Sequence, residues 1–359
     1  MSKRTIIPFG PQHPVLPEPV HLDLVIEDEK VVEAIPSIGY IHRGLEKLVE
    51  KREYTEMVYV IERVCGICSF GHGWGYCKSV EGNMGIVVPD RAEFLRCIWH
   101  ELSRIHSHLL WLGLLADGFG FESLFMHSWR IRETILDIFE KTTGGRVIFS
   151  VCKVGGVRKD ISADGLSEIA GILEGIKSEI MELTNVFLED YSVKNRLVGV
   201  GKLSHSDAIE LCTVGPMARA SGVVQDIRLD GHGAYGKLNF APITEEDGDC
   251  YARCKVRVRE VFQSIDLIKQ AIEQIPEGDI AVAVKGNPQG EFVARMEQPR
   301  GEAYYYSIGN GSKFLQRMRV RTPTNMNIPA MVKTLQGCDL ADVPMLILTI
   351  DPCISCTER

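Results

Sequence analysis

The sequence contains no apolar run that approaches the roughly 20 residues needed to span a bilayer. Its longest apolar stretches are broken by Lys, Glu, Arg or Gly every few positions, so any work at a membrane depends on other subunits that hold the chain there. A secretory signal is also absent, because the N-terminal segment MSKRTIIPFGPQHP has no continuous apolar stretch before a small-residue cleavage site. A cytoplasmic location is therefore expected.

The chain has no excess of positive charge either. Its 48 acidic and 40 basic residues give a net charge of −8, so it has no general attraction to phosphate backbones or anionic lipid, and we expect no nucleic-acid partner. No internal repeat, low-complexity tract or Pro/Ser-rich linker marks a domain boundary. The 359 residues, 45% of them hydrophobic, can fill a sizeable core. We expect a single domain over residues 1–359.

Four stretches carry apolar residues at helical spacing, which predicts four long helices. Because each has one apolar stripe, a bundle is the natural core. The stretches are residues 91–112, 124–142, 162–188 and 258–275.

Two hairpins are predicted outside the bundle. Apolar stretches at residues 22–26 and 31–34 flank a polar turn. Residues 303–306 and 314–321 flank the sequence GNG, and Asn-Gly tolerates positive φ. A small β element is therefore expected to close the chain. The fold class expected is α+β, predominantly helical, with a central long-helix bundle and small peripheral β elements. We place an N-terminal β element at about 1–60, a helical core at about 90–280, and a C-terminal β element with a metal-binding tail at about 285–359.

Eleven cysteines in such a chain are poorly explained by disulfides, which belong to small oxidised domains. Four of them form two Cys-x-x-Cys pairs, Cys65 with Cys68 and Cys353 with Cys356. Together the pairs could supply four thiolates to a structural zinc ion or an iron–sulfur cluster. Structural zinc usually clips one small module, whereas most of the chain separates these pairs, which favours a functional site. Thiolates suit nickel, iron and zinc alike, so ligand type does not settle the metal.

The residues around the cysteines do distinguish these cases. Residues 63–72 read RVCGICSFGH and residues 351–359 read DPCISCTER. The first segment resembles the R-x-C-G-x-C-x-x-x-H motif of [NiFe] hydrogenase large subunits, and the second resembles their C-terminal D-P-C-x-x-C motif. Both motifs occur in the order and at the chain ends where that family has them, which makes the resemblance specific.

The resemblance implies a Ni-Fe(CN)2(CO) centre held by the four cysteines. Nickel would be bound by all four thiolates, with Cys65 and Cys353 terminal and with Cys68 and Cys356 bridging to an iron that carries CO and cyanide. The reaction implied is reversible heterolytic cleavage of hydrogen. By the same resemblance, Cys353 is the sulfur that accepts the proton.

Further site candidates follow from the same resemblance. His72 corresponds to the histidine that hydrogen-bonds a bridging thiolate, although a lone histidine is more often part of a core. Glu18 lies about as far before the first cysteine as the family's proton-relay glutamate, although a surface glutamate in a Pro-rich loop is the alternative. The segment EQPRGE at 297–302 is similar to a family segment whose arginine hangs over the open metal position, which makes Arg300 a candidate and places Pro299 beside it.

Two more elements have counterparts in the family. The segment RTPTN at 321–325 resembles a stretch that donates to a cyanide, which adds Thr324 and Pro323 to the cofactor-binding candidates. Glu46 lies in an R-G-x-E element, whose glutamate binds an accessory Mg²⁺ or Fe²⁺ in many relatives. The partner ligand there is a histidine three residues after the last cysteine, but Arg359 stands at that place. An ion pair between Arg359 and Glu46 is the alternative to a metal.

The body of the chain also resembles the quinone-pocket subunit of complex I, through GPQHP at 10–14, HRGLEKL at 42–48 and PDRAE at 89–93. Subunits of that kind lack the four cysteines, so their retention favours an energy-converting hydrogenase. This resemblance implies an iron–sulfur small subunit, a ferredoxin-like subunit and integral membrane subunits as partners. It also implies ferredoxin as electron partner, coupling to ion translocation, and a peripheral position at the cytoplasmic face of the membrane. The alternative is a complex I-like electron-transfer or scaffold subunit with a structural Cys₄ zinc site.

The other seven cysteines give no clear second site. Cys250 and Cys254 are spaced as a helical pair and are best explained as buried or surface thiols. The remainder are isolated and are predicted to be packing residues, namely Cys77, Cys97, Cys152, Cys212 and Cys338.

Overall fold

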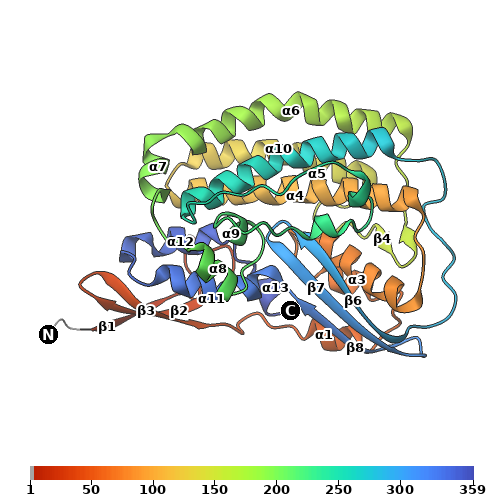
Figure 1. Cartoon of the computed structure of the whole chain (residues 1–359), viewed down its shortest axis with the longest axis horizontal. Helices are drawn as coiled ribbons and strands as arrows, with labels where there is room; N and C mark the ends of the chain where they lie inside the picture. The colour runs from red at the N-terminus through yellow and green to blue at the C-terminus, as the bar shows by residue number, and fades with distance from the viewer. Residues whose placement is uncertain (1–3) are drawn as a thin grey trace.

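The computed structural model describes residues 4–359, and its centre is a bundle of four long helices (Figure 1). In this view the four helices lie side by side above the two larger sheets. This α+β, predominantly helical arrangement confirms the expected fold class. The helices are α4 (Asp90–Gly118), α5 (Glu122–Thr143), α6 (Ala163–Glu189) and α10 (Cys250–Gln274).

The helices follow the predicted apolar stripes. The predicted ranges of α5 and α6 agree closely with the observed bounds, whereas α4 continues to Gly118, beyond the predicted end at residue 112. On α6, the hydroxyl of Ser162 caps the first turn by accepting from the N–H of Gly165 at 3.2 Å. The fourth prediction was too short, because α10 begins at Cys250 rather than near residue 258. Its first turns bury Arg253 and Arg257, and these charged residues interrupt the apolar pattern of a mostly buried segment. Arg257 stacks on the ring of Trp111 at 4.3 Å.

The predicted N-terminal hairpin is confirmed as part of a three-stranded antiparallel sheet. Its strands are β1 (Thr5–Phe9), β2 (His21–Glu27) and β3 (Lys30–Ser37), in the order β1-β2-β3. Alternate residues of β2, Leu22, Leu24 and Ile26, point into the core. The chain then passes through two short helices, α1 (Leu45–Val49) and α2 (Val58–Glu62), to the longer α3 (Ser69–Met84).

The second predicted hairpin is also confirmed, and it gains a strand that the sequence did not suggest. β6 (Gln289–Gln298), β7 (Gly301–Asn310) and β8 (Leu315–Arg321) form an antiparallel sheet in that order. Helix α3 packs against β6 and β7. The outer half of β6 is exposed, so it lacks a continuous apolar pattern.

The expectation that a β element closes the chain is wrong, because only helices follow β8. These are α11 (Pro323–Leu335), the 3-10 turn η3 (Leu340–Asp342), α12 (Val343–Thr349) and α13 (Ile354–Thr357). Pro323 and Pro344 stand in first turns, where a proline costs no intrahelical hydrogen bond. The last helix returns the chain to the centre of the molecule, beside the C-terminal sheet (Figure 1).

Short elements complete the connections around the bundle. Between α5 and α6 lie β4 (Cys152–Lys153) and β5 (Gly156–Val157), and between α6 and α10 lie α7 (Tyr191–Leu197), α8 (His205–Glu210), α9 (Pro216–Arg219), η1 (Ile227–Asp230) and η2 (Tyr235–Lys237). Across residues 4–359, none of the helices combines the length and apolar character that crossing a membrane requires.

Candidate metal centre

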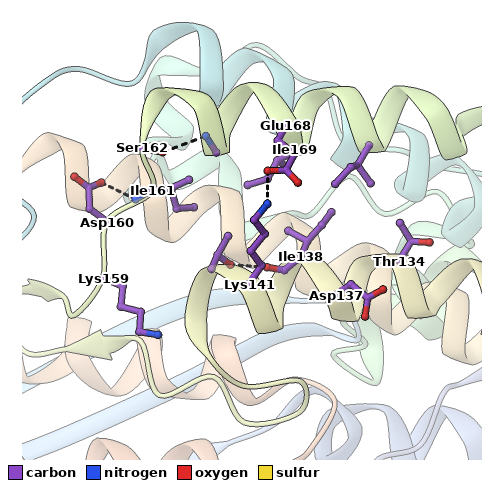
Figure 2. Close-up of a pocket in the computed structure, with 13 residues that line it drawn as sticks. Thr134, Asp137, Ile138, Lys141, Lys159, Asp160, Ile161, Ser162, Glu168 and Ile169 are labelled. Carbon is purple, nitrogen blue, oxygen red and sulfur yellow. Dashed lines mark hydrogen bonds and ion pairs between the residues drawn. The ribbon is translucent and has the colours of Figure 1, made fainter.

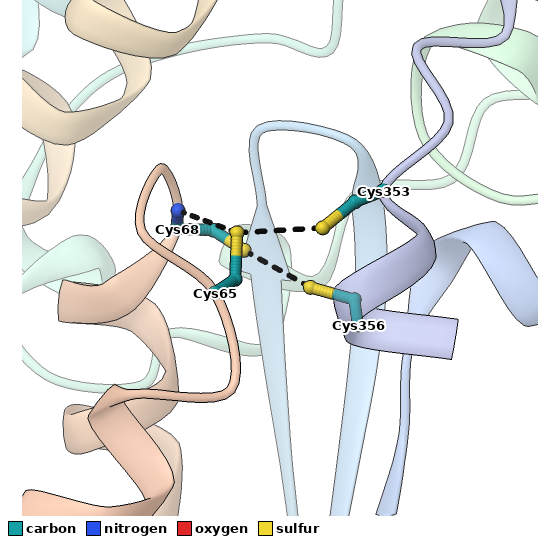
Figure 3. Close-up of side chains that lie close together, drawn as sticks. All are labelled: Cys65, Cys68, Cys353 and Cys356. Atoms are coloured by element: carbon teal, nitrogen blue, oxygen red, sulfur yellow. Dashed lines mark hydrogen bonds between the residues drawn. The ribbon is translucent and has the colours of Figure 1, made fainter. Parts of the chain in front are cut away.

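The structure brings the two cysteine pairs together from opposite ends of the chain (Figure 3). Cys65 and Cys68 lie in the connection from α2 to α3, and Cys353 and Cys356 lie at α13. The Cys65 and Cys353 sulfurs are 3.4 Å apart, the Cys68 and Cys356 sulfurs are also 3.4 Å apart, and all four ligand atoms lie within 4.8 Å of one another. Each cysteine is at most 3% exposed. The four sulfurs therefore form one buried cluster.

Within this cluster, Cys65 is the sulfur best prepared to be a thiolate. The thiol of Cys353 donates to it, and this contact holds the pKa of Cys65 well below its ordinary value. The backbone N–H groups of Ile67 and Cys68 also donate to the Cys65 sulfur, at 3.2 and 3.4 Å. Burial has the opposite effect on Cys356, whose pKa it raises well above the ordinary value. The contact with Cys356 also lowers the pKa of Cys353, so the cluster favours thiolates at Cys65 and Cys353 over Cys356.

His72 stands on the first turn of α3, with its ring between a sulfur and a tyrosine. Its Nε2 lies 3.3 Å from the Cys356 sulfur and its Nδ1 lies 2.9 Å from the hydroxyl of Tyr305. The residue is fully buried, and this burial lowers the pKa of His72 to about 4. The imidazole is therefore neutral at physiological pH.

Arg300 lies in the turn between β6 and β7 and reaches the segment that carries the last two cysteines. Its guanidinium donates to the Asp351 carboxylate at 2.8 Å and to the Asp351 carbonyl at 2.9 Å, with a third contact to Ser107 at 3.4 Å. Pro299 is buried beside it. This fork fixes a permanent positive charge near the sulfurs.

Glu18 contacts the same segment from the N-terminal side. Its carboxylate accepts hydrogen bonds from the backbone N–H groups of Ile354 and Ser355 and from the Ser355 hydroxyl. Burial raises the pKa of Glu18 to about 7, and the neighbouring Cys353 adds to this rise. The Ser355 hydroxyl also lies 3.6 Å from the Cys353 sulfur. Ser355 therefore stands between Glu18 and Cys353.

A cavity of about 340 Å³ opens onto this arrangement. Cys65, Cys353, Arg300 and Glu18 contribute to its wall. Most of the remaining lining is apolar and comes from residues such as Ile67, Leu110, Leu114 and Trp129. The sulfurs are thus reached through a mainly apolar space.

The other predicted residues occupy two places. Thr324 contacts the cysteine segment, because its hydroxyl accepts from the N–H of Cys353 at 3.1 Å, and Pro323 is buried before it at the start of α11. Glu46 lies beside the C-terminal residue, where Arg359 approaches its carboxylate at 3.0 Å. The ion pair that is the alternative to a metal is present in the structure. The Glu46 carboxylate also accepts from the N–H of Val320 at 2.8 Å.

Sequence reasoning missed several residues that hold the cysteine segment in place. The Glu358 carboxylate accepts from the N–H groups of Gly39 and Ile41 at 2.6 and 2.5 Å. Arg43 donates to the carbonyls of Arg63 and Val64 at 2.9 and 2.7 Å. Arg43 lies inside the R-G-x-E element and could have been singled out there. Glu358 carries no such signal, since its partners are distant backbone groups.

The remaining cysteines do not gather at a second site within the part of the chain that the structure describes. Cys250 and Cys254 are buried, as are Cys77, Cys97 and Cys152. The prediction of a packing role is wrong for Cys212, which is exposed at a turn where its backbone has a φ of 52°. Cys338 is half-buried.

A larger pocket of about 570 Å³ lies elsewhere, between α5 and α6 (Figure 2). Ile138, Ile161 and Ile169 form its buried floor, and the ion pair of Lys141 with Glu168 crosses its rim. It shares no residue with the cysteine cavity. Its polar groups are those of an ordinary solvated helix surface, so we assign it no part in the metal centre.

Comparisons with known proteins agree with this geometry. The model of the family described as respiratory-chain NADH dehydrogenase, 49 Kd subunit, matches residues 118–287 and 281–359, and that of nickel-dependent hydrogenase matches residues 43–116. The membrane-bound hydrogenase subunit alpha of Pyrococcus furiosus is 38% identical, with 98% of this chain and 87% of that protein covered. A chain of the NADH-quinone oxidoreductase of Thermodesulfovibrio yellowstonii is 35% identical, with 96% of this chain and 94% of that protein covered.

A solved structure extends the likeness to the whole fold. A chain of the membrane-bound sulfane sulfur reductase, an archaeal respiratory membrane complex, has a TM-score of 0.94 and 29% identity, with 99% of this chain and 98% of that chain covered. Together with the buried four-cysteine cluster, these likenesses settle the family. The chain belongs to the large subunits of [NiFe] hydrogenases of the energy-converting, membrane-bound type, which are related to the 49 kDa subunit of respiratory complex I.

Proposed function

We propose that this chain is the catalytic subunit of an energy-converting hydrogenase and that its four cysteines hold a Ni-Fe(CN)2(CO) centre for reversible cleavage of hydrogen. The observation that carries the proposal is a buried cluster of four sulfurs, two of which line one mainly apolar cavity together with a fixed arginine and a titratable glutamate. A zinc site that only stabilises the fold needs neither the cavity nor the glutamate.

The donor set fits such a centre. A metal about 2.3 Å from each of four sulfurs places tetrahedral neighbours about 3.8 Å apart, and the observed sulfurs lie between 3.4 and 4.8 Å. We assign Cys65 and Cys353 as terminal ligands and Cys68 and Cys356 as the bridging pair. When bound, the centre would supply the redox chemistry that converts H₂ to two protons and two electrons.

The surrounding side chains prepare the site for charge. Arg300 keeps its proton at any physiological pH, so it offsets the negative charge of the thiolates. Its three hydrogen bonds prevent it from turning away. The four sulfurs are buried, as are Pro299, Pro323 and Thr324, so we propose that bulk water has little access to the cluster. Because water is excluded, these electrostatic interactions are stronger than they would be at the surface.

A proton has a short route away from the cluster. The Cys353 sulfur is the proposed acceptor, Ser355 lies beside it, and the hydroxyl of Ser355 donates to Glu18. A carboxyl whose pKa is about 7 can both take and release a proton near neutral pH. The sulfur, the hydroxyl and the carboxylate therefore form a relay from the cluster to the N-terminal loop.

The accessory metal site is proposed to be replaced by an ion pair. Glu46 is contacted by Arg359 at 3.0 Å, and Arg317 lies 3.6 Å away on β8. These cations neutralise the carboxylate that would otherwise attract Mg²⁺ or Fe²⁺.

The partners are proposed from the relatives and from the lack of a second cluster. Within residues 4–359 the four cysteines form the only metal-type grouping, so electrons need an iron–sulfur subunit to leave the site. We propose a ferredoxin-like subunit and ferredoxin beyond it, and integral membrane subunits that couple the reaction to ion translocation. The chain would then lie peripherally on the cytoplasmic face of the membrane.

A second candidate function has one observation in its favour. NADH-quinone oxidoreductase chains are similar over nearly the whole length, so an electron-transfer or scaffold subunit with a structural Cys₄ zinc site would use the same fold. The cavity at Cys65 and Cys353 speaks against a closed structural site.

Isotope exchange between H₂ and D₂O tests the proposed function, because it needs the metal centre but no electron partner. The purified complex should catalyse exchange, and both Cys65→Ser and Cys356→Ser should abolish it, whereas Cys212→Ser at the exposed turn should leave it unchanged. Exchange that survives in either cluster variant would refute the assignment. Reduction of ferredoxin by H₂, measured in the same preparations, tests the electron partner separately.

A further inference from the structure

A chain of hydrogen bonds continues from the cysteine cluster into the C-terminal sheet. His72 connects the Cys356 sulfur, 3.3 Å from its Nε2, to the Tyr305 hydroxyl, 2.9 Å from its Nδ1. The side-chain amide of Gln298 donates to the same hydroxyl at 2.7 Å. All four side chains are at most 1% exposed, so water does not compete for these contacts.

The available donors and acceptors determine which atom donates in each of these hydrogen bonds. An amide NH₂ only donates, so the Tyr305 oxygen accepts from Gln298 and its own single proton remains to be placed. The Nδ1 of His72 at 2.9 Å is a nearer acceptor than the carbonyl of Gly71 at 3.4 Å. With Nδ1 accepting, the proton of the neutral imidazole resides on Nε2. That N–H points at the Cys356 sulfur.

Helix α3 leaves space for Tyr305 and Gln298 to pack against it. Its first turns contain Gly71 and Gly75, and glycine is the poorest helix former apart from proline. A Cβ on Gly75 would lie 2.2 Å from the ring of Tyr305, and a Cβ on Gly71 would lie 3.1 Å from the side chain of Gln298. The glycines therefore leave room for the tyrosine and the amide directly behind His72.

We propose that Tyr305, seated against Gly75 and held by Gln298, is a positioning residue that fixes the tautomer of His72, so that Nε2–H donates to the Cys356 sulfur. A sulfur that accepts a hydrogen bond is a weaker base. The arrangement would therefore lower the charge that the Cys356 sulfur donates to a bound metal. This last consequence rests on the proposed function, whereas the tautomer does not depend on which metal is bound.

Nitrogen-15 NMR of the full chain labelled at histidine tests the tautomer directly, with His72→Gln used to assign the resonances. In the unsubstituted chain His72 should show a protonated Nε2 and an unprotonated Nδ1. Tyr305→Phe, which keeps the ring and removes only the hydroxyl, should give a mixture of both tautomers. Gly75→Ala, which displaces the ring and keeps the hydroxyl, should do the same. The matched control is Tyr304→Phe on the opposite face of β7.

Two outcomes would overturn the proposal. One is a proton on Nδ1 in the unsubstituted chain, which would mean that the Gln298 amide is turned the other way. The other is an unchanged tautomer in Tyr305→Phe while the variant shows the same folded spectrum elsewhere.

A second readout addresses the loaded complex. Infrared bands of iron-bound CO and cyanide should shift in Tyr305→Phe at unchanged metal content and should stay in place in Tyr304→Phe. Bands that coincide in the tyrosine variant and the unsubstituted complex would count against the proposal. If the unsubstituted complex shows no such bands, the proposed function fails, and the NMR result still decides the tautomer.

Discussion

Replacing the buried carboxylate of Glu62 by an amide should stabilise the protein at alkaline pH. Glu62 ends α2, is 2% exposed, and accepts one hydrogen bond from Ser150 at 3.0 Å. Helix α3 passes so close that a Cβ on Gly73 would lie 2.5 Å from the carboxylate. No cation forms an ion pair with it at the distances seen elsewhere in residues 4–359. Burial therefore raises the pKa of Glu62 from 4.5 to about 7.

The size of the effect follows from this shift. A raised pKa means that the folded state holds the proton more tightly than the unfolded state, so folding is penalised once the unfolded carboxylate ionises. The penalty is absent below the unfolded pKa of 4.5, grows as pH rises, and is complete above about 7. A difference of about 2.5 pKa units at 1.36 kcal/mol each gives at most about 3.4 kcal/mol. The amide of Glu62→Gln carries no charge and avoids this penalty.

Denaturant unfolding of the reduced chain across this pH range measures the effect. Glu62→Gln should exceed the unsubstituted chain in free energy of unfolding by up to about 3.4 kcal/mol at about pH 8, and the two should converge near pH 4.5. The control is Glu56→Gln, at an exposed position of the same segment. A variant that is equally stable or less stable at alkaline pH, or one whose advantage is independent of pH, would refute the assignment of a strained buried carboxylate.

Two further substitutions test how the cysteine segment is held. Arg300→Ala leaves the buried Asp351 carboxylate without its ion-pair partner and should lower the free energy of unfolding by about 3 to 5 kcal/mol. Arg300→Lys keeps the positive charge but loses the two-pronged hydrogen bonding, so its loss should be smaller. If calorimetry shows no loss of stability for Arg300→Ala, the ion pair does not stabilise the fold. Glu358→Ala removes the acceptor for two backbone N–H groups and should cost about 1 to 3 kcal/mol while speeding maleimide labelling of Cys356 in the metal-free chain. Glu168→Ala on the surface of α6 should not change that labelling, and equal labelling in both variants would argue against Glu358 as an anchor.

The helical core could be predicted from sequence wherever burial and apolar character coincide. The stripes of α4, α5 and α6 are apolar, so their periodicity was sufficient. It was not sufficient for α3, where glycines at 71, 73, 75 and 82 suppress the helical signal although each meets a neighbouring side chain. The start of α10 was missed because Arg253 and Arg257 are buried against carbonyls and an aromatic ring, contacts that only the tertiary fold supplies.

The candidate site divides in the same way. The spacing of the cysteines and the residues around them predicted the four sulfurs and His72, and the separate segment 297–302 predicted Arg300, because a metal centre restricts residue types at fixed positions. Glu358 and Tyr305 could not be named, since each acts on a group more than two hundred positions away through a contact that no local pattern records. The four cysteines remain the basis for predicting a hydrogenase rather than a complex I subunit, because NADH-quinone oxidoreductase chains are similar over nearly the whole length.

The metal content of the purified complex tests the central claim most directly. Elemental analysis together with infrared spectroscopy should find stoichiometric nickel and iron and the bands of iron-bound CO and cyanide, all of them lost in Cys65→Ser and retained in Cys212→Ser. Zinc alone, bound to the same four cysteines without those bands, would contradict the hydrogenase assignment and leave a structural metal site in its place.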